Sequence, residues 1–325
     1  MRRLIVALTT VALTVVLAAL GPAHAQSYPS KPIRVIVPFA AGGAVDVLAR
    51  LVGAKMSESV GQPVIIENRA GAAGNVAADA VAKSPPDGYT ILQNTNGQAI
   101  SPSLYKSLPF DAVKGFTPVT QLVASQLLLV ATPSLPAKSV QELIALAKAK
   151  PGSLNYGMTG IGNPLHLTVE MFKHAAGMEL QAVPYRGDAP LNTALIAGEV
   201  HLAVVPFATA KPHVEAGRLR ALAIPGAKRS PALPQVPTIA ESGLPGFESS
   251  SWQGWFVPAN TPGEIAALIQ REAAKALNAP DVRERLEATA NEVVASTPEA
   301  FAAVFKNDLV KFAKVVKDAK IPLQD

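Results

Sequence analysis

Short runs of consecutive apolar residues alternate along the chain with longer segments in which apolar positions recur every three or four residues. The run 33–38 ends in Pro38 and is typical of a strand buried in a parallel sheet. A Gly42-Gly43 turn follows, and the segment 45–59 has the spacing of an amphipathic helix that ends at Gly61. Strands separated by helices in this way predict βαβ units and a parallel sheet.

The same rhythm continues toward the C-terminus. Further strands are predicted at 64–67, 89–93, 117–123, 127–131, 154–158, 180–185, 200–206 and 219–224, with a short one at 292–295. Helices are predicted at 76–83, between Ser139 and Pro151, between Asn163 and Gly177, before Gly198, before Gly217, at 265–277 and from Thr297 to about Lys320. Capping residues mark four helix starts: Ser139 with Glu142, Asn163-Pro164, Thr261-Pro262 and Thr297-Pro298.

Two breaks in this rhythm predict two lobes rather than one large sheet. At 110–126 two strand-like runs follow each other without a helix, and 225–255 is rich in Pro, Gly and Ser. We therefore expect an α/β protein whose chain crosses into a second lobe and returns. The expected first lobe is 26–126 plus 225–325 and the second is 127–224, each a mainly parallel sheet flanked by helices.

The N-terminal segment, residues 1–25, is interpreted as a secretory signal peptide. Arg2 and Arg3 precede an apolar run at 4–20, and Ala23-His24-Ala25 is a small-residue cleavage site. The alternative, a membrane anchor, needs about 20 apolar residues, and threonines interrupt this run. No later apolar run is long enough to cross a bilayer. We therefore expect an exported, periplasmic protein.

The composition of the 325-residue chain excludes several classes of protein and site. There is no Cys, which rules out disulfides, thiolate metal sites and a cysteine nucleophile. Hydrophobic residues make up 49%, too many for a disordered chain. The formal net charge of +5 falls to +3 without Arg2 and Arg3, and the basic residues are not clustered, so we expect no nucleic-acid partner.

Three glycine-rich loops lie where predicted strands run into helices, the place where parallel α/β sheets bind ligands. They are 38–46, 157–164 and 184–190. Glycine lets the backbone approach a ligand closely, and unpaired amides at a helix N-terminus favour a negative group. The first loop could equally be a tight turn with Gly43 as N-cap. In the third loop, Arg186 could bind a carboxylate or pair with nearby Asp188.

Catalytic and metal chemistry are not indicated by the sequence. The G-x-S-x-G and H-E-x-x-H motifs are absent, and no loop has the full dinucleotide fingerprint. His166 and Glu170 share a helix face and could form half of a metal site, but a solvated polar pair is favoured because no third ligand is visible. Trp252 and Trp255 are expected to pack in the core or a hinge. We therefore expect a binding protein with no cofactor, metal or catalytic residue.

Eleven short segments, in order, carry a resemblance over essentially the whole mature chain. They are Tyr28-Pro29, 31–34, 38–43, Asp46, 67–75, 86–90, 155–157, His166-Leu167, 184–187, 236–243 and Trp252. No single one is specific, but the ordered set resembles the substrate-binding receptors of tripartite tricarboxylate transporters, also called the Bug (Bordetella uptake gene) family.

The resemblance implies a two-lobed periplasmic-binding-protein fold of the Venus-flytrap kind, type II-like. A small organic carboxylate would be held between the lobes, largely by backbone amides and bridging waters, and delivered to a membrane permease of one small and one large subunit. We expect the receptor to be a monomer. Carried over residue by residue, the ligand-binding residues would be Phe39, Ala40, Gly42, Gly43 and Asp46 on one side, and Thr159, Asn163, His166, Tyr185, Arg186, Gly187 and Asp188 on the other.

Two alternatives to a transport receptor stay open at this point. One is a sensory adaptor that presents the loaded clamp to a membrane sensor kinase. The other is a periplasmic enzyme that acts on small acids through His166 or Asp46.

The chain also departs from the family pattern at three positions. Ala70 replaces a Pro and Ala73 a Gly of the family, and Asp188 interrupts a run of small residues after Arg186-Gly187. If Asp188 faces the cleft, it would repel a second carboxylate or select a ligand that carries a donor.

Overall fold

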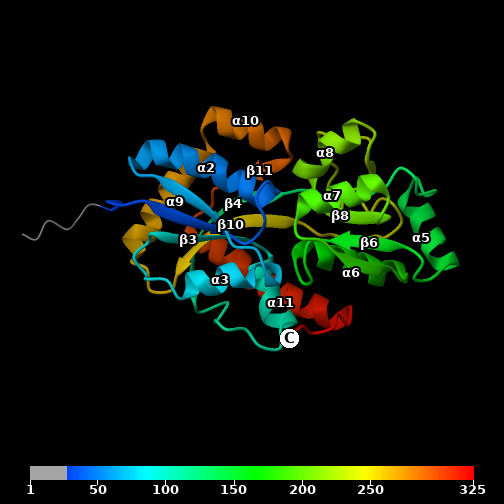
Figure 1. Ribbon diagram of the computed structural model, residues 1–325, viewed down its shortest axis with the longest axis horizontal. Helices are drawn as coiled ribbons and strands as arrows, with labels where there is room; N and C mark the ends of the chain where they lie inside the picture. Colours follow the sequence, from blue (N-terminus) through cyan, green and yellow to red (C-terminus); the bar gives the residue numbers. More distant parts are fainter. Residues whose placement is uncertain (1–27) are drawn as a thin grey trace, which may run out of the picture.

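The computed structural model describes residues 28–325, which form two lobes lying side by side along the long axis of the molecule (Figure 1). Residues 1–27, with the predicted signal peptide, lie outside the described part. No helix within 28–325 is long and apolar enough to cross a membrane.

Each lobe contains one sheet. The first sheet comprises β1 (Ile33–Val37), β2 (Val64–Asn68), β3 (Thr90–Thr95), β4 (Phe116–Ser125), β10 (Ser251–Pro258) and β11 (Asn291–Val293). The second comprises β5 (Leu127–Ala131), β6 (Asn155–Met158), β7 (Gln181–Pro184), β8 (Leu202–Pro206) and β9 (Arg220–Ala223).

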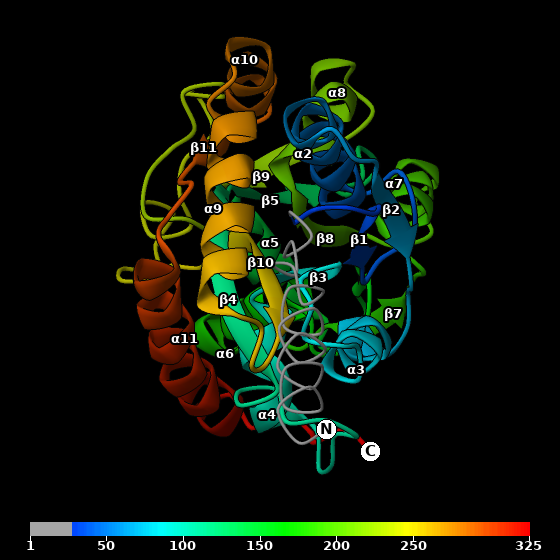
Figure 2. The ribbon, with the colours of Figure 1, turned by 90° about the vertical axis from the view of Figure 1, so that its left-hand side faces the viewer.

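Helices flank both sheets. The first lobe has α2 (Ala44–Val60), the 3-10 turn η1 (Ala72–Gly74), α3 (Asn75–Ala82), α4 (Gly97–Leu104), α9 (Gly263–Leu277), α10 (Pro280–Ala288) and α11 (Pro298–Asp318). The second has α5 (Val140–Ala149), α6 (Pro164–Ala176), α7 (Asp188–Ala197) and α8 (Phe207–Glu215). Figure 2 looks onto the first lobe and shows its helices packed around the sheet.

The two sheets share one topology, with strand orders β2-β1-β3-β10-β4-β11 and β7-β6-β8-β5-β9. In each, one strand that arrives from the other lobe, β10 or β5, is inserted antiparallel between its neighbours. Both sheets are therefore mixed, but apart from the inserted strand, and β11 in the first sheet, their strands run in one direction, as expected for mainly parallel sheets. An incoming strand needs no crossover helix to reach its place, so it can run against the strands beside it.

Alternating side chains give each sheet a core on both faces. In β5, Leu127, Leu129 and Ala131 pack with α5 and α6, whereas Leu128 and Val130 pack with α7 and α8. The first sheet is covered by α2, α9 and α10 on one face and by α3, α4 and α11 on the other. This explains the continuous apolar runs in the sequence, since both faces of each strand are buried.

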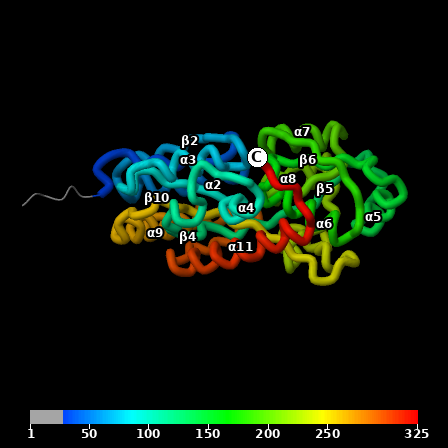
Figure 3. The backbone as a smooth tube through the Cα atoms, turned by 90° about the horizontal axis from the view of Figure 1, so that it is seen from below, coloured from blue at the N-terminus to red at the C-terminus, as the bar shows by residue number. Residues whose placement is uncertain are grey.

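The chain passes between the lobes at two places. Only Gln126 separates β4 of the first sheet from β5 of the second. The return was expected at 224–225, but Leu233 and Val236 pack with α7 and α8, and Phe247 packs with α6. This packing favours a return close to residue 250, and the lobe boundaries themselves stay a prediction. Figure 3 shows the C-terminal segment at the junction, where α11 shares a hydrophobic cluster with Leu167 of α6.

Most predicted elements are confirmed, and some were missed. Ser139, Asn163 and Thr297 cap their helices as expected, whereas Thr261 hydrogen-bonds to Pro258 O and the cap of α9 is Pro262. The missed helices and strand are α4, α10 and β10, and the short 3-10 turn η1 was not predicted either. The Trp252 and Trp255 side chains of β10 are buried as predicted.

Candidate functional site

A cavity of about 50 Å³ lies where the two lobes meet, at the N-terminal ends of α2, α6 and α7. Residues of both lobes line it. They are Phe39, Ala40, Gly43, Ala44, Val45, Thr95, Ser125, Ser251 and Gln253 from the first lobe and the crossings, and Leu127, Thr159, Asn163, Pro164, Leu165, Pro206, Gly187 and Asp188 from the second. Seven of the twelve predicted site residues are in this lining.

The glycine loops of the two lobes touch each other beside this cavity. A side chain added at Gly43 would begin 3.1 Å from Asp188 Oδ2, and one at Gly187 would begin 3.3 Å from Ala40 Cβ. A side chain added at Gly160 would begin 3.7 Å from Ala73 Cα, an ordinary contact distance. The absence of side chains therefore lets the lobes close on each other here.

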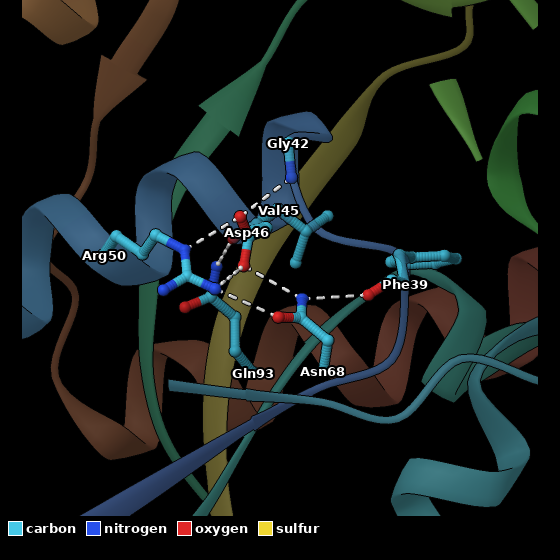
Figure 4. Close-up of polar contacts among 7 residues, drawn as sticks. All are labelled: Phe39, Gly42, Val45, Asp46, Arg50, Asn68 and Gln93. Carbon is cyan, nitrogen blue, oxygen red and sulfur yellow. Dashed lines mark hydrogen bonds and ion pairs between the residues drawn. The ribbon is translucent and has the colours of Figure 1, made fainter. Parts of the chain in front are cut away.

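Asp46 holds the first loop from behind rather than lining the cavity (Figure 4). Its carboxylate accepts hydrogen bonds from Gly42 N at 2.9 Å, Asn68 Nδ2 at 2.9 Å and Arg50 Nε at 3.0 Å. Burial alone would raise the pKa of Asp46, but these bonds outweigh it and hold the pKa below its ordinary value. The side chain thus fixes the β1–α2 turn and stays ionised.

A buried amide supports the other end of the same loop. Gln93 Nε2 donates to Val45 O at 2.8 Å, and Gln93 Oε1 accepts from Trp255 Nε1 at 2.9 Å (Figure 4 shows Gln93 beside Val45). Gln93 also donates to Gln253 Oε1, which places Gln253 in the cavity wall. The start of α2 is therefore held by β3 and β10 of the sheet below it.

The second loop is organised by Asn163. Its Oδ1 caps α6 by accepting from His166 N at 2.9 Å, and its Nδ2 donates to Thr159 Oγ1 at 2.7 Å. His166 Nδ1 accepts from Gly162 N at 3.1 Å, and burial lowers the pKa of the imidazole. His166 does not line the cavity. As a neutral ring it accepts the hydrogen bond from Gly162 N and so holds the glycine loop in place.

The pair His166–Glu170 is not the solvated pair expected from the sequence. The His166 side chain is buried and that of Glu170 is half-buried, and His166 Nε2 lies 3.9 Å from Glu170 Oε1. Glu170 is bound by Tyr156 Oη at 2.6 Å and Lys173 Nζ at 2.7 Å. Within residues 28–325 no group of three or more His, Asp or Glu side chains could hold a metal ion.

The third loop sends one charged side chain into the cavity. Asp188 Oδ2 accepts from Ala44 N at 3.2 Å, which joins the start of α7 to the start of α2 across the lobe boundary. Burial raises the pKa of this carboxyl. Tyr185 packs against the core of the second lobe, and Arg186 is exposed, so neither lines the cavity. Gly42 borders a separate outer groove between α2 and α7.

Four polar residues of the cavity wall were missed by sequence reasoning: Thr95, Ser125, Ser251 and Gln253. Thr95 ends β3, so the rule that singled out the glycine loops could have found it. Ser125 ends β4 and Ser251 begins β10, next to the two crossings, and β10 was not predicted from the sequence. Their hydroxyls and the Gln253 amide can donate to a ligand oxygen.

This arrangement is suited to holding a small anion. Three helix N-termini bring the positive ends of their dipoles to the cavity, and the lining offers hydroxyl and amide donors. Of the described residues that line the cavity, Asp188 alone is titratable. Recognition would therefore use dipoles and hydrogen bonds rather than an ion pair with Lys or Arg.

The comparison with known families agrees with this geometry. A family model described as "Tripartite tricarboxylate transporter family receptor" matches residues 48–321. The chain belongs to this family. Its members are solute-binding receptors. BugT of Bordetella pertussis is 35% identical over 94% of this chain and 94% of its own, and a protein of Pseudomonas sp. strain P51 is 37% identical over 91% and 88%.

Solved structures of similar proteins have the same two-lobed periplasmic-binding-protein fold. An R. palustris protein solved with adipate has a TM-score of 0.88 and 38% identity, covering 91% of this chain and all of its own. MatC of Rhodopseudomonas palustris, solved with bound malate, has a TM-score of 0.86 and 32% identity over 89% of this receptor and all of its own chain. The fold of this family member is therefore that of periplasmic binding proteins.

Proposed function

We propose that this receptor captures a small organic carboxylate between its two lobes and delivers it to a membrane permease of one small and one large subunit. Export by the signal peptide at 1–25 would place it in the periplasm. The lobes would close around the ligand by a hinge at Gln126 and near residue 250, and ligand contacts to both lobes would stabilise the closed form.

The observation that carries this proposal is the convergence of α2, α6 and α7 on one cavity between the lobes. A hydrogen bond to a charged group contributes about 1.5–3 kcal/mol net. Four to six such bonds around one carboxylate would offset the cost of association and reach micromolar affinity, near −8 kcal/mol. The relatives solved with adipate and with malate favour the same class of ligand.

We assign direct ligand contacts to the lining residues and a positioning role to others. Phe39, Ala40, Gly43, Thr159, Asn163, Gly187 and Asp188 face the ligand, joined by Thr95, Ser125, Ser251 and Gln253. Gly42, Asp46 and His166 hold the loops in place. Tyr185 packs beneath the third loop, and Arg186 is left for a contact at the rim of the cleft.

Isothermal titration calorimetry tests the proposed class of ligand. The purified mature protein is titrated with dicarboxylates, amino acids and aromatic acids, and thermal unfolding is followed with each. We expect micromolar binding of at least one acid and a matching rise in the midpoint of unfolding. Absence of both signals with the whole panel would count against a carboxylate receptor. Turnover of a bound acid during the incubation would indicate an enzyme instead.

The substitution Gly43→Val tests the location of the site. Gly43 has φ −78°, so valine fits the backbone, but its side chain would begin 3.1 Å from Asp188 Oδ2 and would fill the cavity. We expect affinity to fall at least tenfold with little change in stability. Gly263→Val is the matched control, because Gly263 also begins a helix and has open space around its Cβ position. Equal affinity in Gly43→Val and wild type would show that the ligand binds elsewhere.

A further inference from the structure

Asp188 brings a negative charge to the centre of the lobe interface. It is the first residue of α7, and its carboxylate reaches across to the first residue of α2, Ala44. The Oδ2···N distance is 3.2 Å, and Oδ2 also lies 3.1 Å from the Cβ position of Gly43. The carboxylate therefore occupies part of the positive end of the α2 dipole, where a ligand anion would otherwise bind.

Asp188 has no counter-ion within the described part of the chain. In residues 28–325 its carboxylate accepts one hydrogen bond, from Ala44 N, and forms no ion pair. Arg186 is exposed and does not pair with it. On the outer side, Arg50 and Arg285 border the groove that Asp188 also reaches, but Arg50 is paired with Asp46 at 2.9 Å.

The cavity thus has two different ends, the start of α2 with the negative Asp188 carboxylate and the N-terminus of α6. The N-terminus of α6 reaches the cavity through Asn163, Pro164 and Leu165. Pro164 has no N–H and Asn163 caps His166 N, so α6 offers a carboxylate the N–H of Leu165 and the positive end of its dipole. Burial disfavours the charge of Asp188, which the raised pKa of its carboxyl reflects. A second carboxylate on the ligand would add like charge in a site of low dielectric, whereas an ammonium would neutralise Asp188.

We infer that Asp188 determines ligand specificity, so that the cleft prefers a carboxylate carrying an ammonium group over a dicarboxylate of the same length. This inference rests on the proposed function and narrows its ligand class. It also separates this receptor from the relatives solved with adipate and malate, whose ligands carry two carboxyl groups and no amine.

Calorimetry with matched ligand pairs tests the inference. The pairs are glutarate with 5-aminovalerate, adipate with 6-aminohexanoate, and succinate with 4-aminobutyrate. In the wild-type protein we expect the amino member of at least one pair to bind ten or more times tighter than its partner. Asp188→Asn should lower the preference for the amino member over its dicarboxylate partner at least tenfold, chiefly because dicarboxylates bind more tightly to the variant.

Two further variants keep the result interpretable. Asp188→Ser retains a hydroxyl acceptor for Ala44 N and should shift the ratio in the same direction as Asp188→Asn. Glu199→Gln removes an exposed charge just beyond the other end of α7 and should leave the ratio unchanged. A thermal melt of each variant checks that the fold is intact.

The possible outcomes separate the inference from the function on which it rests. If dicarboxylates bind more tightly in wild type and Asp188→Asn leaves the ratio unchanged, the inference is wrong and the receptor function stands. If Asp188→Asn raises the affinity for both ligands of a pair equally, Asp188 only competes with the ligand for the α2 amide. It would then not discriminate between ligand charges, which also overturns the inference. Failure of every pair to bind either protein would overturn the inference, whereas the receptor function fails only if the whole calorimetric panel, aromatic acids included, also gives no signal.

Discussion

At the scale of single residues, the cleft contains positions with unusual features, either a left-handed backbone conformation or a carboxylate without a counter-ion. Ala73 is one of them. It has φ 52° and ψ 26°, inside a turn flanked by Gly71 and Gly74, and its side chain faces Gly160 of the other lobe. Left-handed backbone is unfavourable for alanine, whereas glycine adopts it freely. The sequence singled out Ala73 only as a departure from the family.

We expect Ala73→Gly to stabilise the protein. Relief of the left-handed conformation outweighs the added freedom of glycine in the unfolded chain, for a net gain of about 0.5–1 kcal/mol. Ala80→Gly is the matched control, because Ala80 lies within α3 and the same change there should cost about 1 kcal/mol. Both are measured by urea unfolding. Destabilisation by the two substitutions alike would contradict the assigned conformation of Ala73.

The same scale shows which site residues a sequence can reveal. Gly43, Gly187 and Asp188 were placed at the cleft because glycine loops after strands mark ligand sites in α/β folds. Asp46 and His166 were expected to touch the ligand, but both turn to backbone amides of their own loops. The sequence identifies the polar residues of a loop. The direction of each side chain, however, depends on hydrogen-bond partners on other elements, such as Asn68 of β2, which binds Asp46.

At the scale of elements, short sequence motifs correctly predicted features that depend only on neighbouring residues, such as helix N-caps. Ser139, Asn163 and Thr297 begin helices through a side-chain hydrogen bond to a residue three positions ahead, which a short window can reveal. β10 was missed because its place is set by β3 and β4, which lie far away in sequence. Gly254 of β10 shows the same dependence, since any side chain there would meet the ring of Phe301.

The α6 loop should make stability depend on pH through His166. Burial places the folded-state pKa of His166 below its unfolded value of about 6.5. Below that pH the unfolded chain binds more protons than the folded one, so the free energy of unfolding should decrease as the pH falls from about 7 to 5. Glu170, which favours the protonated ring, and Lys173, which opposes it, are the charges that face His166 from α6.

His166→Asn is the variant that isolates this effect. Asparagine can still accept from Gly162 N but does not titrate, so the decrease should become smaller. His213, whose pKa is also lowered by burial and by Arg218, leaves part of the dependence in place. Chemical unfolding at several pH values measures the difference between the two proteins. Parallel curves for wild type and variant would show that the pKa of His166 is the same in the folded and the unfolded chain, which would contradict the effect assigned to burial.

At the scale of the whole molecule, two sheets of similar topology lie on either side of a cavity. Each sheet contains one strand, β10 or β5, that the chain enters directly after leaving the other lobe. The two breaks in the strand–helix rhythm predicted two lobes correctly. They did not predict the mixed sheets, because strand direction follows from where the chain re-enters a lobe. They also did not fix the second crossing, since residues such as Phe247 pack on the second lobe in spite of their loop-like composition.

The central claim, that a carboxylate is held between the lobes by the N-termini of α2, α6 and α7, is tested most directly by a crystal structure of the complex. The protein would be crystallised with the acid that binds most tightly in calorimetry. We predict ligand density in the cavity, with a carboxylate oxygen at about 2.7–3.2 Å from backbone amides of loops in both lobes. A ligand bound outside the cavity, or to one lobe alone, would contradict the account.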